Sequence, residues 1–84
     1  MNPRPVAVSV LSGMNLEITF QNGEVRIFNV EPYLQDIPAL QRLRDRQYFR
    51  NAHIAHHTVA WSDDEDICPD TLYLTSQPLQ QKAA

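Results

Sequence analysis

Two alternating segments joined by Asn22-Gly23 constrain the fold more than any other feature of the sequence. Apolar and polar side chains alternate in residues 14–20 (MNLEITF), and residues 24–30 (EVRIFNV) follow as a second strand. Asn-Gly is typical of the two-residue type I′ turn, which needs positive φ at both central residues. The segment therefore predicts an antiparallel hairpin in a sheet with one buried face.

A two-residue loop also fixes the register of this hairpin. It places Phe20 opposite Val25 and Ile18 opposite Ile27 on the core face. The same register turns Phe28 outward. We therefore expect either a bulge near the end of the second strand or partial cover of the outer face.

The other segments predict an α+β fold. They indicate a strand at 5–11, a helix at about 38–45, a second short hairpin at 52–61 and a short helix from Pro69. We expect an antiparallel three-stranded meander plus a second short hairpin, packed on one main helix, with a short C-terminal helix. A single domain over residues 5–75 and a polar C-terminal tail at 76–84 follow.

Composition narrows the classes of function. The 84 residues carry a net charge of −3, which argues against direct binding of nucleic acid, because that needs clustered Lys and Arg. A single Cys cannot form an internal disulfide and suits a reducing cytoplasm. The sequence shows neither a signal peptide nor an apolar stretch long enough to span a membrane. It predicts no cofactor.

The acidic stretch WSDDEDICPDTLYLTS at 61–76 has two interpretations. Clustered carboxylates can bind Ca²⁺ or Mg²⁺, but the spacing here lacks the central Gly of an EF-hand loop. Alternatively, the stretch is a solvated turn in which Asp66 accepts hydrogen bonds from the backbone at the start of the next helix. We favour the second interpretation, with Asp70 complementing the helix dipole.

The same stretch predicts a structural corner. Trp61 ends a strand, Pro69 begins the helix, and Leu72 and Tyr73 are placed to fold back over Trp61. Together with Asp66, these residues should close the core.

A second hypothesis makes the chain a small metal- or ligand-binding domain or an enzyme. It would use Asp66 with His53 or His57 and Cys68, since such side chains bind Zn²⁺ and a Cys–His pair supports nucleophilic catalysis. The spacing matches no recognised zinc motif, and exposed hairpin ends tolerate His. The sequence alone therefore assigns no metal ligand and no catalytic residue.

Four of the seven basic residues lie within nine positions: Arg42, Arg44, Arg46 and Arg50. We name these four residues the arginine surface. They form either a solvated helix face or a docking surface for an acidic partner, a second copy of the chain, or nucleic acid. The strand at Val6–Val10 offers a further candidate, a sheet edge for pairing with a second copy.

Three segments carry a resemblance to a known family: LEITFQNGEVRIFNVEPYL (16–34), LRDRQYF (43–49) and TVAWSDDEDICPDTLY (58–73). In order and spacing the chain resembles the bacterial family catalogued as domain of unknown function 2442. The resemblance implies a small α+β domain, found alone or beside a helix-turn-helix segment, with no established biochemical role. Asp66 and Asp70 match its pattern, whereas Asp63, Asp64 and Glu65 replace its usual turn.

These observations predict a non-enzymatic protein-interaction or regulatory module of the bacterial cytoplasm. The resemblance implies a transcription-linked or toxin–antitoxin-like setting. The expected partner is an unknown protein or a second copy of the chain. An enzyme would instead gather Asp66, a His and Cys68 in one pocket.

Overall fold

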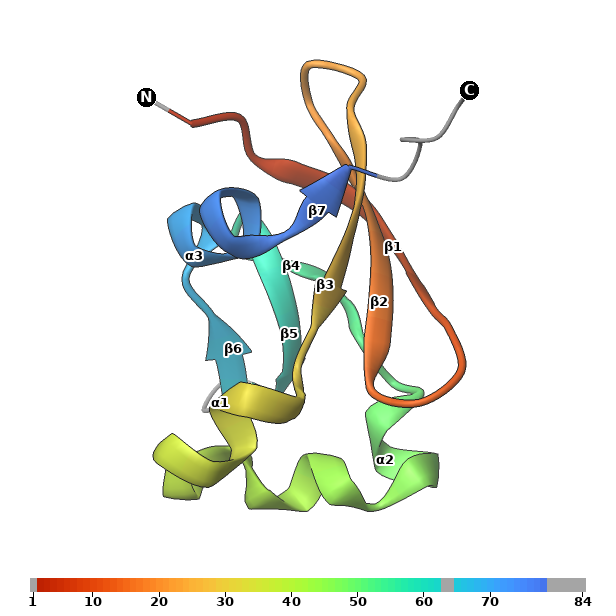
Figure 1. Ribbon diagram of the computed structural model, residues 1–84, viewed down its shortest axis with the longest axis vertical. Coiled ribbons are helices and arrows are strands. Elements are labelled where there is room, and N and C mark those ends of the chain that lie inside the picture. The colour runs from red at the N-terminus through yellow and green to blue at the C-terminus, as the bar shows by residue number, and fades with distance from the viewer. Residues whose placement is uncertain (1, 63–64, 79–84) are drawn as a thin grey trace.

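The computed structural model describes residues 2–62 and 65–78 and has an α+β fold with two antiparallel sheets (Figure 1). The first sheet, in the order β1-β2-β3-β7, consists of Pro5–Val10, Asn15–Phe20, Val25–Asn29 and Gln77–Pro78. The second, in the order β4-β5-β6, consists of His53–Ala55, Thr58–Ser62 and Glu65–Ile67. The helical segments are α1 (Glu31–Asp36), the 3₁₀ helix η1 (Pro38–Arg44), α2 (Arg46–Phe49) and α3 (Pro69–Thr75). None of the described helices is long and apolar enough to cross a membrane.

The β2–β3 hairpin forms, but with a three-residue loop in place of the predicted two-residue loop. The Gly23 N–H donates to the Phe20 carbonyl at 2.9 Å, and the Phe20 N–H donates to the Glu24 carbonyl at 2.8 Å. Gly23 has a φ of +93°. A tight turn followed by a residue with positive φ is a common three-residue connection between strands. The register therefore shifts by one residue from the prediction.

This register explains the position of Phe28. Leu16 pairs with Phe28 and Ile18 pairs with Arg26, so Phe28 points into the core. The predicted partners of Phe20 and Ile18 are therefore wrong, and the β2–β3 pairing needs no bulge. One consequence is that Arg26 lies on the core face of the sheet.

The main helix predicted at about 38–45 forms as η1, a 3₁₀ helix, and it lies between two short α-helices, α1 and α2. Pro32 and Pro38 stand at the starts of α1 and η1, and the Asp45 side chain caps α2 by accepting from its backbone at 3.1 Å. Leu40 and Leu43 are buried from η1. Their spacing of three residues matches the 3.0 residues per turn of a 3₁₀ helix.

The predicted second hairpin forms as β4 and β5, and β6 extends it to a three-stranded sheet. His56 and His57 make the two-residue turn, with φ of 53° and 67°. Residues other than glycine rarely adopt positive φ, although His does so more often than most. β4 and β5 lie beside β1, and therefore beside the edge at Val6–Val10 that the sequence offered for pairing.

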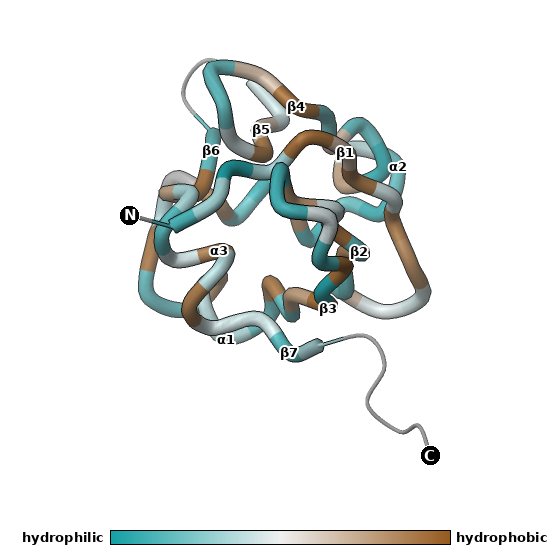
Figure 2. Tube along the Cα trace, turned by 90° about the horizontal axis from the view of Figure 1, so that it is seen from above, coloured by the Kyte–Doolittle hydropathy of each residue, from teal (hydrophilic) through white to brown (hydrophobic). Residues whose placement is uncertain are grey.

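One hydrophobic core draws on both sheets and on every helical segment. Its fully buried large side chains include Leu16, Ile18, Phe20, Phe28, Leu34, Leu43, Phe49 and Leu72. Trp61 is 5% exposed, stacks on Phe49 at 5.9 Å between ring centroids, and donates its indole N–H to the Phe49 carbonyl at 2.9 Å. Seen from above, hydrophobic positions recur along β1, β4 and β5 (Figure 2).

Residues 76–78, directly after α3, join the first sheet; of the polar tail predicted at 76–84, residues 79–84 lie outside the described residues. Gln77 and Pro78 form β7 and pair with β3. Arg26 is the physical reason, because its Nε donates to Ser76 Oγ and its Nη2 donates to the Ser76 carbonyl, each at 2.8 Å. Ser76 is buried by this arrangement.

Candidate functional site

Glu65 provides the buried carboxylate of the acidic stretch. Its side chain is 5% exposed and accepts hydrogen bonds from the hydroxyls of Tyr48 and of Ser62, the latter at 2.8 Å. Arg42 Nε lies 3.8 Å from Glu65 Oε2. The hydrogen bond from Tyr48 above all lowers the pKa of Glu65; Ser62 and Arg42 lower it further, against the effect of burial. Glu65 thereby ties β6 to η1 and α2.

Asp66, the predicted cap of α3, has a different position. It is exposed on β6 opposite Ala60 of β5. Cys68 occupies the N-cap position of α3 without a side-chain cap, and no hydrogen bond joins Asp66 to α3 within the described residues. The capping prediction is therefore wrong. Strand alternation turns Glu65 and Ile67 inward and Asp66 outward.

The other residues of the predicted corner lie on β5 and on α3. Trp61 and Leu72 are buried. Asp70 lies in the first turn of α3, as the sequence predicts. Tyr73 packs edge-on against the ring of Phe20 at 5.1 Å rather than over Trp61. The turn residues at 63 and 64 lie outside the described residues.

The members of the predicted metal or catalytic set lie apart. His53 and Asp66 share a row of the second sheet on opposite sides of Ala60, so two strand spacings, about 10 Å, separate their backbones. His57 lies in the β4–β5 turn, and Cys68 is exposed before α3. Over residues 2–62 and 65–78, no three His, Cys, Asp or Glu side chains come together as a metal site.

Within the arginine surface, Arg42 and Arg46 are engaged in contacts that hold the fold together. Arg46 donates to backbone carbonyls of the β1–β2 turn, including that of Leu11 at 2.8 Å. Arg42 lies over the ring of Tyr48 at 4.2 Å, a cation–π contact, and beside Glu65. Both guanidinium groups connect η1 and α2 to the sheets.

Arg44 and Arg50 are engaged less. Arg44 Nη1 lies 3.7 Å from Glu31 Oε2, and both side chains are about half exposed, so this pair contributes little to stability. Arg50 is exposed, and no hydrogen bond or ion pair of its side chain occurs among the described residues. Arg44 Nε also donates to Gln41 Oε1 at 3.2 Å, and the Arg42 side chain is 69% exposed, so Arg42, Arg44 and Arg50 all present charge to a partner.

Arg26 is a partly buried cation that the predicted register did not place on the core face. Besides its bonds to Ser76, it pairs with Glu24 Oε1 at 3.0 Å and lies over the ring of Tyr73 at 4.8 Å. The Tyr73 hydroxyl donates to Glu24 Oε2 at 2.9 Å, and this bond is the main reason that the pKa of Glu24 is lowered. The network fastens α3 and β7 to β3, which is a structural role.

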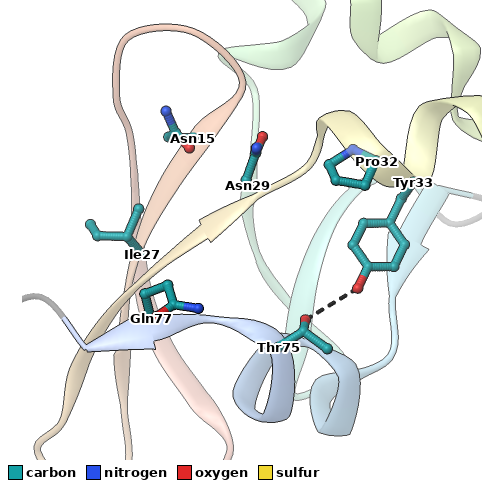
Figure 3. A pocket seen from close by; sticks show the side chains of 7 residues that line it. All are labelled: Asn15, Ile27, Asn29, Pro32, Tyr33, Thr75 and Gln77. Atoms are coloured by element: carbon teal, nitrogen blue, oxygen red, sulfur yellow. Dashed lines mark hydrogen bonds between the residues drawn. The ribbon is translucent and has the colours of Figure 1, made fainter.

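A pocket of about 370 Å³ opens where β3, β7, α1 and α3 meet. Its lining consists of Asn15, Ile27, Asn29, Pro32, Tyr33, Thr75 and Gln77 (Figure 3). Tyr33 donates its hydroxyl to Thr75 Oγ1 at 3.2 Å across one side of the pocket. The lining carries amides, hydroxyls and apolar groups but no Asp, Glu, Lys, Arg or His. The lining residues come from five elements, β2, β3, α1, α3 and β7, so the sequence could have predicted the pocket only with the correct strand register.

Comparison with known proteins places these features in context. The family described as "Protein of unknown function (DUF2442)" matches residues 5–78. No curated protein matches the chain. Among solved structures, the chain is similar to NE0471 of Nitrosomonas europaea ATCC 19718, described as a "putative DNA binding protein", with 33% identity and a TM-score of 0.77. The similarity covers 87% of this chain and 48% of NE0471, so this chain corresponds to about half of that protein.

This similarity corrects one prediction. From the net charge of −3, the sequence argues against direct binding of nucleic acid, whereas NE0471, which has a similar fold, is described as a "putative DNA binding protein". Net charge averages over the whole chain, but binding depends on where the cations lie. The exposed arginines of η1 and α2 concentrate positive charge on one part of the surface, which the net charge of the whole chain does not reveal.

Proposed function

Because this chain belongs to the DUF2442 family of proteins of unknown function, we propose its role from its surfaces: it is a non-enzymatic protein-interaction or regulatory module in a transcription-linked setting. The observation that carries this proposal is the division within the arginine surface. Arg42 and Arg46 contact distant segments of the chain, whereas Arg44 makes only exposed contacts and Arg50 has no hydrogen bond or ion pair among the described residues. Guanidinium groups that are held in place, beside others that face solvent, suit docking on an acidic partner.

Site-specific photo-crosslinking in the native cell tests this proposal. A benzophenone amino acid replaces Gln47, which is exposed on α2 beside the arginine surface, or Gln21, which is exposed in the distant β2–β3 loop. We expect a discrete crosslinked partner from position 47 only. The paired substitution Arg44→Gln and Arg50→Gln should abolish it, and Arg4→Gln should leave it intact. Identical crosslinks from both positions, or none from position 47, would contradict the proposal.

A second candidate function is direct binding of duplex DNA. It is favoured by the similarity to NE0471 at 33% identity. The arginine surface is the natural contact for phosphates, because Arg binds them through two donors at once.

Fluorescence anisotropy with a labelled 20-base-pair duplex at several salt concentrations tests this candidate. Each phosphate contact contributes about 0.9 to the slope of log K against log salt concentration, so Arg44→Gln with Arg50→Gln should reduce that slope by about 2. Arg4→Gln, which removes one positive charge outside the arginine surface, serves as the control. Absence of binding at low salt, or an unchanged slope in the paired variant, would rule this candidate out.

A further inference from the structure

The pocket between β3, β7, α1 and α3 is separate from the arginine surface, and its chemistry differs. Every residue that lines it is uncharged at neutral pH. None of these side chains offers a counter-charge, so a charged ligand would form no ion pair here. A purely apolar ligand would leave the amides of the lining without partners, which is costly. The lining therefore suits a neutral ligand with hydrogen-bonding groups.

Two asparagines on neighbouring strands define which groups the ligand must carry. Asn15 and Asn29 are direct partners across β2 and β3. Because Val30 N–H bonds to the Met14 carbonyl one position further on, the two asparagines form a non-hydrogen-bonded pair, with Cα atoms about 4.5 Å apart. Leu16 and Phe28 face the core, so both amides lie on the outer face and line the pocket (Figure 3).

The backbone fixes the orientation of both amides. Asn15 Nδ2 donates to the Ser12 carbonyl at 3.2 Å, which leaves its Oδ1 as an acceptor. Asn29 Oδ1 accepts from the Glu31 N–H at 3.0 Å, which leaves its Nδ2 as a donor. Within the described residues neither remaining group has another partner, so the pocket presents an acceptor beside a donor.

An aromatic wall completes the pocket. The Tyr33 ring stacks on Phe28, with 5.4 Å between centroids and 22° between planes, and its hydroxyl is bonded to Thr75. These contacts hold the ring in one orientation before any ligand arrives. Pro32 and Ile27 add apolar surface nearby. Rigid aromatic and apolar walls with a few oriented polar groups are typical of preformed sites for planar ligands.

We propose that this pocket binds a nucleobase. A base carries a donor and an acceptor side by side on one edge and a flat face for contact with Tyr33. A trans peptide group points its N–H and C=O in opposite directions, so it cannot satisfy both asparagines at once. The site goes beyond the docking role proposed above and does not depend on it.

Nuclear magnetic resonance titration of the ¹⁵N-labelled chain with uridine tests the proposal. We expect saturable shifts of the side-chain amide signals of Asn15 and Asn29, with the resonances of the arginine surface unmoved. The control ligand is 3-methyluridine, which lacks the N3 donor but keeps the ring. It should bind about tenfold more weakly, because one good bidentate contact to a base discriminates by roughly that factor or more.

Two variants separate a binding role from a folding role. Asn29→Asp keeps the acceptor for Glu31 N–H but removes the free donor, so it should fold and lose uridine binding at least about tenfold. Asn51→Asp makes the same chemical change on an exposed residue outside the lining and should bind like the parent. Thermal melting of both variants shows whether they are folded.

Four results would each overturn the proposal: equal affinity for uridine and 3-methyluridine, shifts at other positions, no shifts at all, or unchanged binding by folded Asn29→Asp. If uridine binds as expected, a titration with oligo-dT identifies the source of the base. Shifts at the same amides indicate a base within a single strand, and their absence indicates a free nucleoside.

Discussion

At the scale of single residues, burial separates carboxylates that look alike in the sequence. Glu65 and Asp66 are adjacent, yet Glu65 is 4% exposed and bonded to two hydroxyls, while Asp66 faces solvent. The signal was present in the sequence: if 65–67 is a strand, an inward Ile67 requires an inward Glu65. The inward position of Glu65 was missed because a run of acidic residues usually indicates a solvated turn. Glu65 is buried here because Tyr48, a residue distant in the sequence, donates a hydrogen bond to it.

Replacing the two carboxylates one at a time tests this assignment. Glu65→Gln should lower the free energy of unfolding by about 2 kcal/mol, because the bonds from Tyr48 and Ser62 become weaker neutral hydrogen bonds and Arg42 loses its charged partner. Asp66→Asn should change it by less than about 0.5 kcal/mol, as for most exposed substitutions. Urea titration followed by Trp61 fluorescence measures both. Equal effects of the two substitutions would show that Glu65 has no special role.

The same carboxylate predicts a dependence of stability on pH. The pKa of Glu65 is lowered in the folded chain, so ionised Glu65 stabilises the fold above its unfolded pKa of about 4.3. That stabilisation is lost as pH falls through the lower, folded pKa. The parent should therefore lose stability below about pH 5 more steeply than Glu65→Gln. Urea midpoints of both proteins that decline in parallel would count against the assignment.

At the scale of elements, the sequence predicts where strands lie better than how they pair. The hairpin at Asn22-Gly23 and the helix from Pro69 form where the pattern places them. The register was out of reach, since Gly23 serves a two-residue and a three-residue loop equally well. The spacing of three residues between Leu40 and Leu43 fits a 3₁₀ helix, but the apolar stripe of an α-helix contains the same spacing. The leucine pattern alone therefore could not distinguish the two kinds of helix.

The β4–β5 turn yields a prediction at this scale. His57 has a φ of 67°, a conformation that costs a residue with a Cβ about 1 kcal/mol. His57→Gly should raise the free energy of unfolding by about 0.5 kcal/mol after the greater flexibility of unfolded glycine is deducted. His57→Val should lower it, because a branched Cβ resists positive φ. Thermal melting compares the two, and a stabilising Val would refute the account of this turn.

At the scale of the whole molecule, the fold class, the family and the clustering of four arginines could be predicted from the sequence, but the pocket and the contacts that the arginines make could not. An α+β domain with a thin aromatic core follows from alternation and length. The pocket and the engaged arginines depend on contacts between distant segments, such as Arg46 with the β1–β2 turn. The spacing of apolar and polar residues along the sequence does not predict contacts of this kind. The arginine surface therefore divides in two: Arg42 and Arg46 contact distant segments of the chain, whereas Arg44 contacts only exposed side chains and Arg50 has no hydrogen bond or ion pair among the described residues.

One comparison of unfolding free energies tests that claim most directly. Arg42→Gln with Arg46→Gln and Arg44→Gln with Arg50→Gln remove equal charge from the same surface. Urea titration should show a loss of about 2 kcal/mol for the first pair, which gives up charged hydrogen bonds and ring contacts. The second pair should lose less than about 0.5 kcal/mol. The reverse ranking would contradict the account, because Arg44 and Arg50 would then be part of the fold rather than available for binding.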